Sequence, residues 1–141
     1  MSEMVITLLK VRCDEVTDDF LEGLTDEFGW RVCAVDAAGD EVLRLEEIPM
    51  KGLESVAAGS VHSPDRELAR VGADAWMAQV EFWDQDTFGT DDLLGWIEIR
   101  RGVGPGLTLS GGDSTEDLGG GAFRLTGENG DYTVWLKVEE Q

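Results

Sequence analysis

Apolar and polar residues alternate with a period of two along most of the chain. The alternation is clearest over residues 4–13 and 75–83, and a further alternating segment covers residues 94–100. A period of two predicts strands that turn one face toward a core. For the first of these strands, the predicted core-facing residues are Val5, Thr7, Leu9, Val11 and Cys13.

Turn-forming residues divide other parts of the chain into pairs of short strands. Residues 28–36 and 41–48 flank Ala37-Ala38-Gly39-Asp40, a turn sequence, and are predicted to form a hairpin. A second hairpin is predicted between residues 122–126 and 131–139, which are joined by a segment that contains Asn and Gly.

Two segments depart from the strand pattern. The pair Ser63-Pro64 has the features of a helix start, and Gly72 has those of a helix stop, so a short helix is predicted over residues 64–71. Residues 102–121 are rich in glycine and show no periodicity, which predicts a long irregular connection.

Together these segments predict one all-β domain over residues 1–141. A weak strand near residues 54–62 brings the total to about eight strands, and short strands joined by turns are typical of an antiparallel β-sandwich. A chain of 141 residues is long enough to bury a core without disulfides or a structural metal. The predicted fold is therefore an antiparallel eight-stranded β-sandwich with one short helix.

The charge of the chain restricts its partners. Thirty acidic and 11 basic residues give a formal net charge of -19, which repels nucleic acid and bare anionic membranes. Solvation of the surface, or adaptation to salt, accounts for the total charge. It does not account for two acidic clusters, within residues 14–27 and 84–92, because like charges gathered together are unfavourable without a cation among them. A partner should be neutral, basic or bridged by cations.

The two cysteines and the N-terminus favour a cytoplasmic protein. Cys13 and Cys33 each lie in an apolar alternating run and lack the Cys-x-x-Cys spacing of a redox site, so we expect buried free thiols. A disulfide between neighbouring strands is the alternative. The N-terminus lacks the features of a signal peptide, and no apolar run approaches the length of a membrane span.

The second acidic cluster has the composition of a site for a hard cation. Asp84, Asp86 and Asp92 lie between two predicted strands, and closely spaced carboxylates suit Ca²⁺. An EF-hand is excluded because Phe88 and Gly95 stand where that loop needs oxygen ligands and because the flanks are strands. A solvated turn that binds nothing is the simplest alternative. The other acidic cluster argues against it, since loops at one end of a sandwich lie close together.

The sequence of this segment resembles a known family. Residues 80–95, Val-Glu-Phe-Trp-Asp-Gln-Asp-Thr-Phe-Gly-Thr-Asp-Asp-Leu-Leu-Gly, resemble the third calcium-binding loop of C2 domains, where a strand ends in Asp-x-Asp and a later Asp precedes two apolar residues and a glycine. Thr25-Asp26-Glu27-Phe28 is similar to the end of the family's first loop, although Glu27-Phe28 replaces the usual Pro-Tyr. The strand order resembles the family's second topological variant. The ligands that the resemblance implies are Asp19, Asp26, Asp84, Asp86 and Asp92, with Asp18 as a substitute for Asp19.

The resemblance implies a calcium-binding module without catalytic activity. Such a module docks peripherally to a phospholipid membrane or to a protein partner through its acidic loops. The apolar residues expected at the loop tips are Phe88, Leu24 and Phe20, although Phe20 and Leu24 are equally expected to fold back under their loop. Basic residues are scattered along the sequence and form no evident groove, so binding to lipid would depend on calcium.

Two other classes of function, an adaptor and an enzyme, compete with a calcium-binding module. A structural or adaptor sandwich could self-assemble or bind a protein through Trp96 or Trp135, with calcium only stabilising it or absent. Trp135 is alternatively expected to pack against a long side chain of a neighbouring strand. An enzyme is disfavoured, because His62 is the only histidine and the sequence has no nucleophile motif to accompany it.

Overall fold

The computed structural model describes residues 3–16, 25–85, 91–102 and 106–141. Within these residues the protein is all-β, with no α-helix. The elements are β1 (Met4–Glu15), β2 (Thr25–Asp26), β3 (Phe28–Asp36), β4 (Glu41–Glu47), β5 (Val56–Ala57), β6 (Val61–His62), β7 (Arg66–Val71), β8 (Ala75–Asp84), β9 (Asp92–Arg101), β10 (Leu107–Gly111), β11 (Thr115–Gly119), β12 (Ala122–Leu125), the 3-10 turn η1 (Gly127–Asn129) and β13 (Asp131–Glu140). The predicted all-β class is confirmed, but the described residues contain thirteen strands where about eight were predicted.

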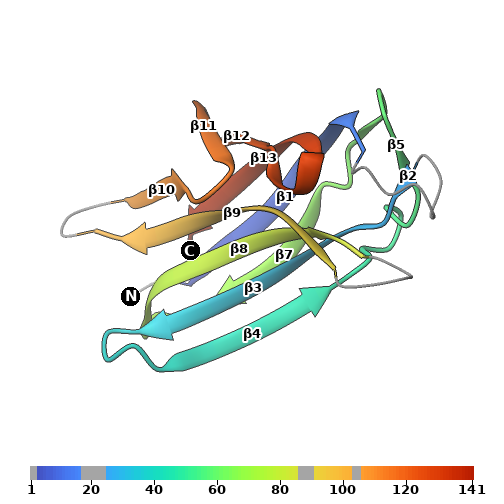
Figure 1. The fold of residues 1–141 in the computed structure, drawn as a ribbon. Coiled ribbons are helices and arrows are strands. Elements are labelled where there is room, and N and C mark those ends of the chain that lie inside the picture. Colours follow the sequence, from blue (N-terminus) through green and yellow to red (C-terminus); the bar gives the residue numbers. More distant parts are fainter. Residues whose placement is uncertain (1–2, 17–24, 86–90, 103–105) are drawn as a thin grey trace.

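Two antiparallel sheets form the body of the molecule (Figure 1). The first has the order β11-β12-β13-β1-β6, with β7 also paired to β1, and the second has the order β10-β9-β8-β3-β4. Strands β2 and β5 form a small separate pair. Apolar side chains from both large sheets form one buried cluster, and the ring of Phe28 in β3 lies 5.2 Å from that of Tyr132 in β13. The sheets therefore pack face to face, as a β-sandwich requires.

The first strand changes its inward face along its length. Its pairing with β13 shifts by one residue between Leu8 and Lys10, which is a β-bulge. Ile6 and Leu8 are buried before the shift, and Val11 and Cys13 are buried after it. An extra residue reverses the alternation of side chains. The predicted burial was therefore right for Val5, Val11 and Cys13, whereas Thr7 and Leu9 are only half-buried and Ile6 and Leu8 face the core in their place.

The helix predicted over residues 64–71 is wrong. Arg66–Val71 is the strand β7, which pairs with β1 from Met4↔Val71 to Leu8↔Arg66. A helix of eight residues has little stability of its own. As a strand, the segment supplies backbone hydrogen bonds to the edge of β1 and buries Leu68 in the core.

The irregular connection predicted over residues 102–121 is also wrong for the part described. Strands β10 and β11 occupy much of it, β10 on the second sheet and β11 on the first. The glycines fit tight turns and close contacts: a Cβ atom at Gly112 would lie 2.0 Å from the indole of Trp96. Trp96 thus lies beneath the turn between β10 and β11 and is not an open contact residue.

Both hairpins predicted from turn sequences are confirmed. Strand β3 pairs with β4, and β12 pairs with β13. The weak strand predicted near residues 54–62 is reduced to the two-residue strands β5 and β6. Both cysteines are free thiols as expected, although only Cys13 is fully buried and Cys33 is half-buried.

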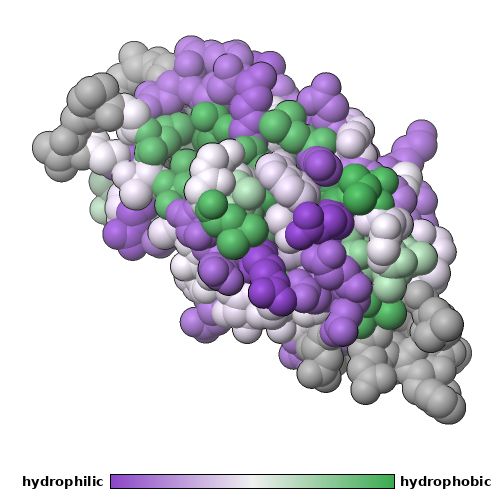
Figure 2. All heavy atoms as spheres, turned by 90° about the horizontal axis from the view of Figure 1, so that it is seen from above, coloured by the Kyte–Doolittle hydropathy of each residue, from purple (hydrophilic) through white to green (hydrophobic). Residues whose placement is uncertain are grey.

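Apolar side chains on the surface are dispersed. On the face drawn in Figure 2, hydrophilic residues separate the apolar ones into small patches. The large apolar side chains that are exposed in the described residues are Val42, Leu45, Val61 and Leu118. Trp135 is half-buried, and Lys10 Nζ of β1 lies 4.6 Å from its ring centre. Of the two predictions for Trp135, packing against a long side chain of a neighbouring strand is therefore the one confirmed. No helix of the described residues is long and apolar enough to span a membrane.

Candidate functional site

The described ends of the two acidic segments, residues 14–16, 25–27, 84–85 and 91–92, lie at the same end of the sandwich. Strand β1 ends there at Glu15, β3 begins there at Phe28, and the β8–β9 connection joins Asp84 to Asp92 (Figure 1). The pairing of the strands requires this arrangement, because Phe28 is opposite Asp84 and Asp84 is opposite Asp92. The pairing of β3 with β8 therefore brings residues near 26 close to those near 84, as the sequence predicted.

Asp26 is buried at this end and contacts β13 of the first sheet. It is only 2% exposed, and its Oδ2 accepts a hydrogen bond from the hydroxyl of Tyr132, which is fully buried in β13. Strand β2, to which Asp26 belongs, pairs with β5 through Asp26↔Val56. A buried carboxyl that accepts a hydrogen bond from a buried hydroxyl is held in one orientation. Asp26 thus links the small β2–β5 pair to the core-facing side of the first sheet.

Burial and the Asp26 carboxyl keep the neighbouring groups protonated. Burial raises the pKa of Tyr132, and its hydrogen bond to Asp26 and the negative charge of Asp26 raise it further. Burial raises the pKa of the Cys13 thiol to about 11; the hydrogen bond with Tyr132 opposes this shift, while the charge of Asp26 adds to it. Both groups are therefore neutral at pH 7, and the Tyr132 hydroxyl keeps the proton that it donates.

Asp84 is the second buried carboxyl at this end. It is 1% exposed, and its Oδ1 accepts a hydrogen bond of 2.8 Å from the backbone N–H of Glu27, the residue after Asp26. The backbone N–H of Gln85 in turn donates to the carbonyl of Glu27 at 2.9 Å. These bonds fasten the end of β8 to the segment between β2 and β3. Glu27 and Asp84 are 57 positions apart in the sequence. Their hydrogen bond therefore shows that Asp26 and Asp84 lie on adjacent segments.

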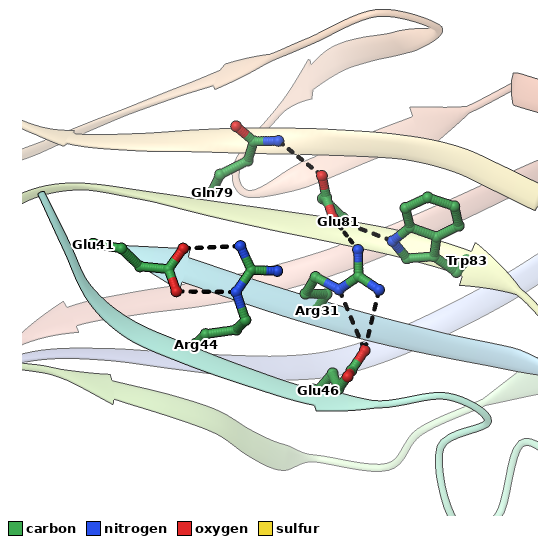
Figure 3. A network of polar contacts seen from close by, with 7 residues as sticks. All are labelled: Arg31, Glu41, Arg44, Glu46, Gln79, Glu81 and Trp83. Atoms are coloured by element: carbon green, nitrogen blue, oxygen red, sulfur yellow. Dashed lines mark hydrogen bonds and ion pairs between the residues drawn. The ribbon is translucent and has the colours of Figure 1, made fainter. Parts of the chain in front are cut away.

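A polar network on the outer face of the second sheet fixes the residue before Asp84. Trp83 Nε1 donates to Glu81 Oε1 at 3.3 Å, and the guanidinium of Arg31 lies 5.2 Å from the Trp83 ring centre (Figure 3). Arg31 also pairs with Glu46 of β4 at 3.2 Å. Because successive side chains of a strand point to opposite faces, an outward Trp83 leaves Asp84 pointing inward.

Only part of the predicted ligand set falls within the described residues. Asp26, Asp84 and Asp92 are described; Asp18, Asp19 and Asp86 lie outside, as do the predicted contact residues Phe20, Leu24 and Phe88. Among residues 3–16, 25–85, 91–102 and 106–141, no three His, Cys, Asp or Glu side chains are grouped so that they could hold a metal ion. A calcium site with three or more carboxylate ligands would therefore need side chains from residues 17–24 or 86–90.

Sequence reasoning did not identify Tyr132 as part of this end, and it did not predict the hydrogen bond from the Glu27 backbone to Asp84. One signal for Tyr132 was present: it is the only tyrosine, and the alternation of the last strand places it on the core-facing side. A buried tyrosine hydroxyl usually has a hydrogen-bond partner, so a buried acceptor could have been anticipated. The backbone N–H of Glu27 carries no sequence signal.

Comparison with known proteins does not identify a family. No protein-family model matches the sequence, and no curated protein matches it.

Proposed function

We propose that the protein is a calcium-binding module with a C2-like sandwich, which docks to a phospholipid membrane or a protein partner through the loops at one end. The observation that carries the proposal is that Asp26 and Asp84, both almost completely buried, lie on adjacent segments at the end where the two acidic loops emerge. Carboxylate oxygens are the ligands that a hard cation such as Ca²⁺ prefers.

The connectivity supports the C2-like part of the proposal. Strand β1 leads directly into the first acidic segment, and β13 closes the chain beside β1. Both features are those expected of the second topological variant of the C2 family. Residues 80–84 of the motif end β8 and residues 92–95 begin β9, and this strand–loop–strand context supports the resemblance.

In the proposed site, Asp26, Asp84 and Asp92 supply carboxylate oxygens, together with Asp86 and either Asp19 or Asp18. Calcium would neutralise these carboxylates and could bridge them to the phosphate of a lipid or to an acidic group of a protein. The protein itself orients two of the ligands: Tyr132 donates to Asp26, and the Glu27 backbone donates to Asp84. Docking in the absence of calcium is opposed by the net charge of -19.

The paired position of Asp92 offers a sharp test. Asp92 lies directly opposite Asp84, and like charges at directly opposite positions destabilise a sheet. Asp92→Asn should therefore leave the calcium-free protein equally or more stable while it weakens calcium binding. Asp40→Asn, in the β3–β4 turn at the other end, removes the same charge and serves as the control.

Isothermal titration calorimetry with calcium measures the binding directly. The wild type and the Asp40→Asn variant should bind at millimolar calcium or below, and Asp92→Asn should bind more weakly. Absence of binding by the wild type at millimolar calcium contradicts the proposal. Sedimentation with liposomes, in calcium and in chelator, then distinguishes a lipid partner from a protein partner.

An adaptor that works without calcium is the second candidate. The hydrogen bond between Tyr132 and Asp26 favours it, because this bond gives the buried Asp26 a structural role that needs no metal. This candidate predicts no response to calcium and self-association or capture of a partner instead. Light scattering that shows a monomer at high concentration, with and without calcium, would argue against self-assembly.

A further inference from the structure

An open pocket of about 450 Å³ lies between the segment that follows β4 and the β6–β7 connection. Its lining residues are Lys51, Gly52, Leu53, Val61, His62, Ser63, Pro64 and Arg66. Two of these are basic and one is the only histidine, whereas none is acidic, although the chain has 30 acidic residues. The pocket is therefore an exception to the acidic character of the molecule, and its volume is within the range of small-molecule sites.

Lys51 differs from the other basic residues. Nine of the 11 basic residues form an ion pair within 4.0 Å: Arg12, Arg31, Arg44, Arg66, Arg70, Arg100, Arg101, Arg124 and Lys137. Lys10 lies over the ring of Trp135. Within the described part of the chain, Lys51 alone has neither kind of partner, and its side chain is exposed at the pocket.

Two other polar side chains of the pocket, Arg66 and His62, have partners of their own. Arg66 pairs with Glu47 of β4, and this pairing still leaves guanidinium N–H groups for a ligand. His62 Nε2 lies 3.2 Å from Ser60 Oγ. Two nearby acids accept bonds from the backbone: Glu47 accepts from the N–H of Lys51 at 2.9 Å, and Glu54 accepts from the N–H of Gly52 at 2.8 Å. The positive charge of Lys51 also acts on Glu54, although the two form no ion pair.

We propose that this pocket binds a phosphomonoester carried on a small apolar group, with Lys51 as the principal charge partner. A phosphomonoester has a charge of about -1.5 to -2 at pH 7 and three terminal oxygens, which matches donors supplied by Lys51, Arg66 and the hydroxyl of Ser63. Leu53, Val61 and Pro64 form the apolar part of the lining. A carboxylate has fewer oxygens and less charge, and so fits this set of donors less well.

The test uses phenyl phosphate as the probe, with calcium removed by a chelator so that the result is independent of the calcium site. Calorimetry should show saturable binding to the wild-type protein, tighter than that of inorganic phosphate or benzoate. Lys51→Ala should weaken binding about tenfold, as expected for loss of one charge-assisted hydrogen bond, and Lys51→Arg should largely restore it. Lys137→Ala removes an exposed lysine of β13 and should have no effect.

The proposal is overturned if phenyl phosphate does not bind at millimolar concentration, or if Lys51→Ala and Lys137→Ala weaken binding equally. If inorganic phosphate bound as tightly as phenyl phosphate, the proposed role of the apolar group of the ligand would be overturned. Folding of each variant is checked by circular dichroism and by its melting temperature. Vesicles of phosphatidylcholine with and without phosphatidic acid, sedimented in chelator, distinguish the sources: a lipid headgroup gives sedimentation only with phosphatidic acid, and a soluble ligand gives none.

Discussion

The hydrogen bond from Tyr132 to Asp26 should contribute strongly to the stability of the loop end. Tyr132→Phe removes only the hydroxyl and keeps the ring, whose centre lies 5.2 Å from that of Phe28. The bond joins residues that are 0% and 2% exposed, and a hydrogen bond to a charged group contributes about 1.5–3 kcal/mol. We expect the free energy of unfolding to fall by about 2–3 kcal/mol and the melting temperature by about 6–12 °C.

A double-mutant cycle separates this bond from the packing of the ring. In an Asp26→Ala background the Tyr132 hydroxyl is buried without its acceptor, so Tyr132→Phe should then be neutral or stabilising. Urea unfolding of the four proteins gives the coupling energy, which we expect to be about 2–3 kcal/mol because the bond is lost in one background and already absent in the other. An equal cost of Tyr132→Phe in both backgrounds, or a cost below about 0.5 kcal/mol in the wild type, would refute the assignment.

Three further predictions concern other parts of the molecule. The free energy of unfolding should fall as pH rises from about 9 to about 11. Unfolding exposes Cys13 and lets it ionise near its ordinary pKa of 9.0, whereas the folded state holds that pKa at about 11. Urea unfolding across this range should show a smaller fall for Cys13→Ala, and an equal fall in both proteins would contradict the reasoning. Gly112→Ala should lower the free energy of unfolding by about 1–3 kcal/mol because its Cβ would overlap Trp96. The control Gly102→Ala, whose Cβ would have no described atom within 4 Å, should lower it little. Equal melting temperatures of the two variants would contradict the contact with Trp96. Phe82→Ala should cost about 3–5 kcal/mol in urea unfolding because Phe82 is fully buried and stacks on Phe28, and a loss below 1 kcal/mol would place it outside the core.

Strands with a strong period of two were predicted correctly because their burial pattern is local. Strands β3, β8 and β9 place Val32, Val80 and Ile97 in the core as the alternation required. The helix predicted over residues 64–71 failed because the local start and stop signals competed with pairing to β1, which the sequence does not reveal. The bulge near Leu9 is likewise set by pairing with β13.

The candidate site was predictable only in part, for the same reason. The strand order was enough to bring residues near Asp26 and Asp84 to one end. The acceptor role of Asp26 toward Tyr132 depends on how the two sheets face each other across the core. The pocket around Lys51 and Arg66 depends on the segment after β4 lying beside the start of β7, so scattered basic residues in the sequence gave no sign of it.

Thermal melting in calcium, magnesium and chelator tests the central claim most directly. A ligand that binds only the folded protein stabilises it by about 2.7 kcal/mol at 100 times its dissociation constant. We predict that calcium raises the melting temperature of the wild-type protein by several degrees, that magnesium raises it less, and that Asp92→Asn removes most of the calcium effect. Identical melting curves in millimolar calcium and in chelator would contradict the proposal that this acidic end binds calcium.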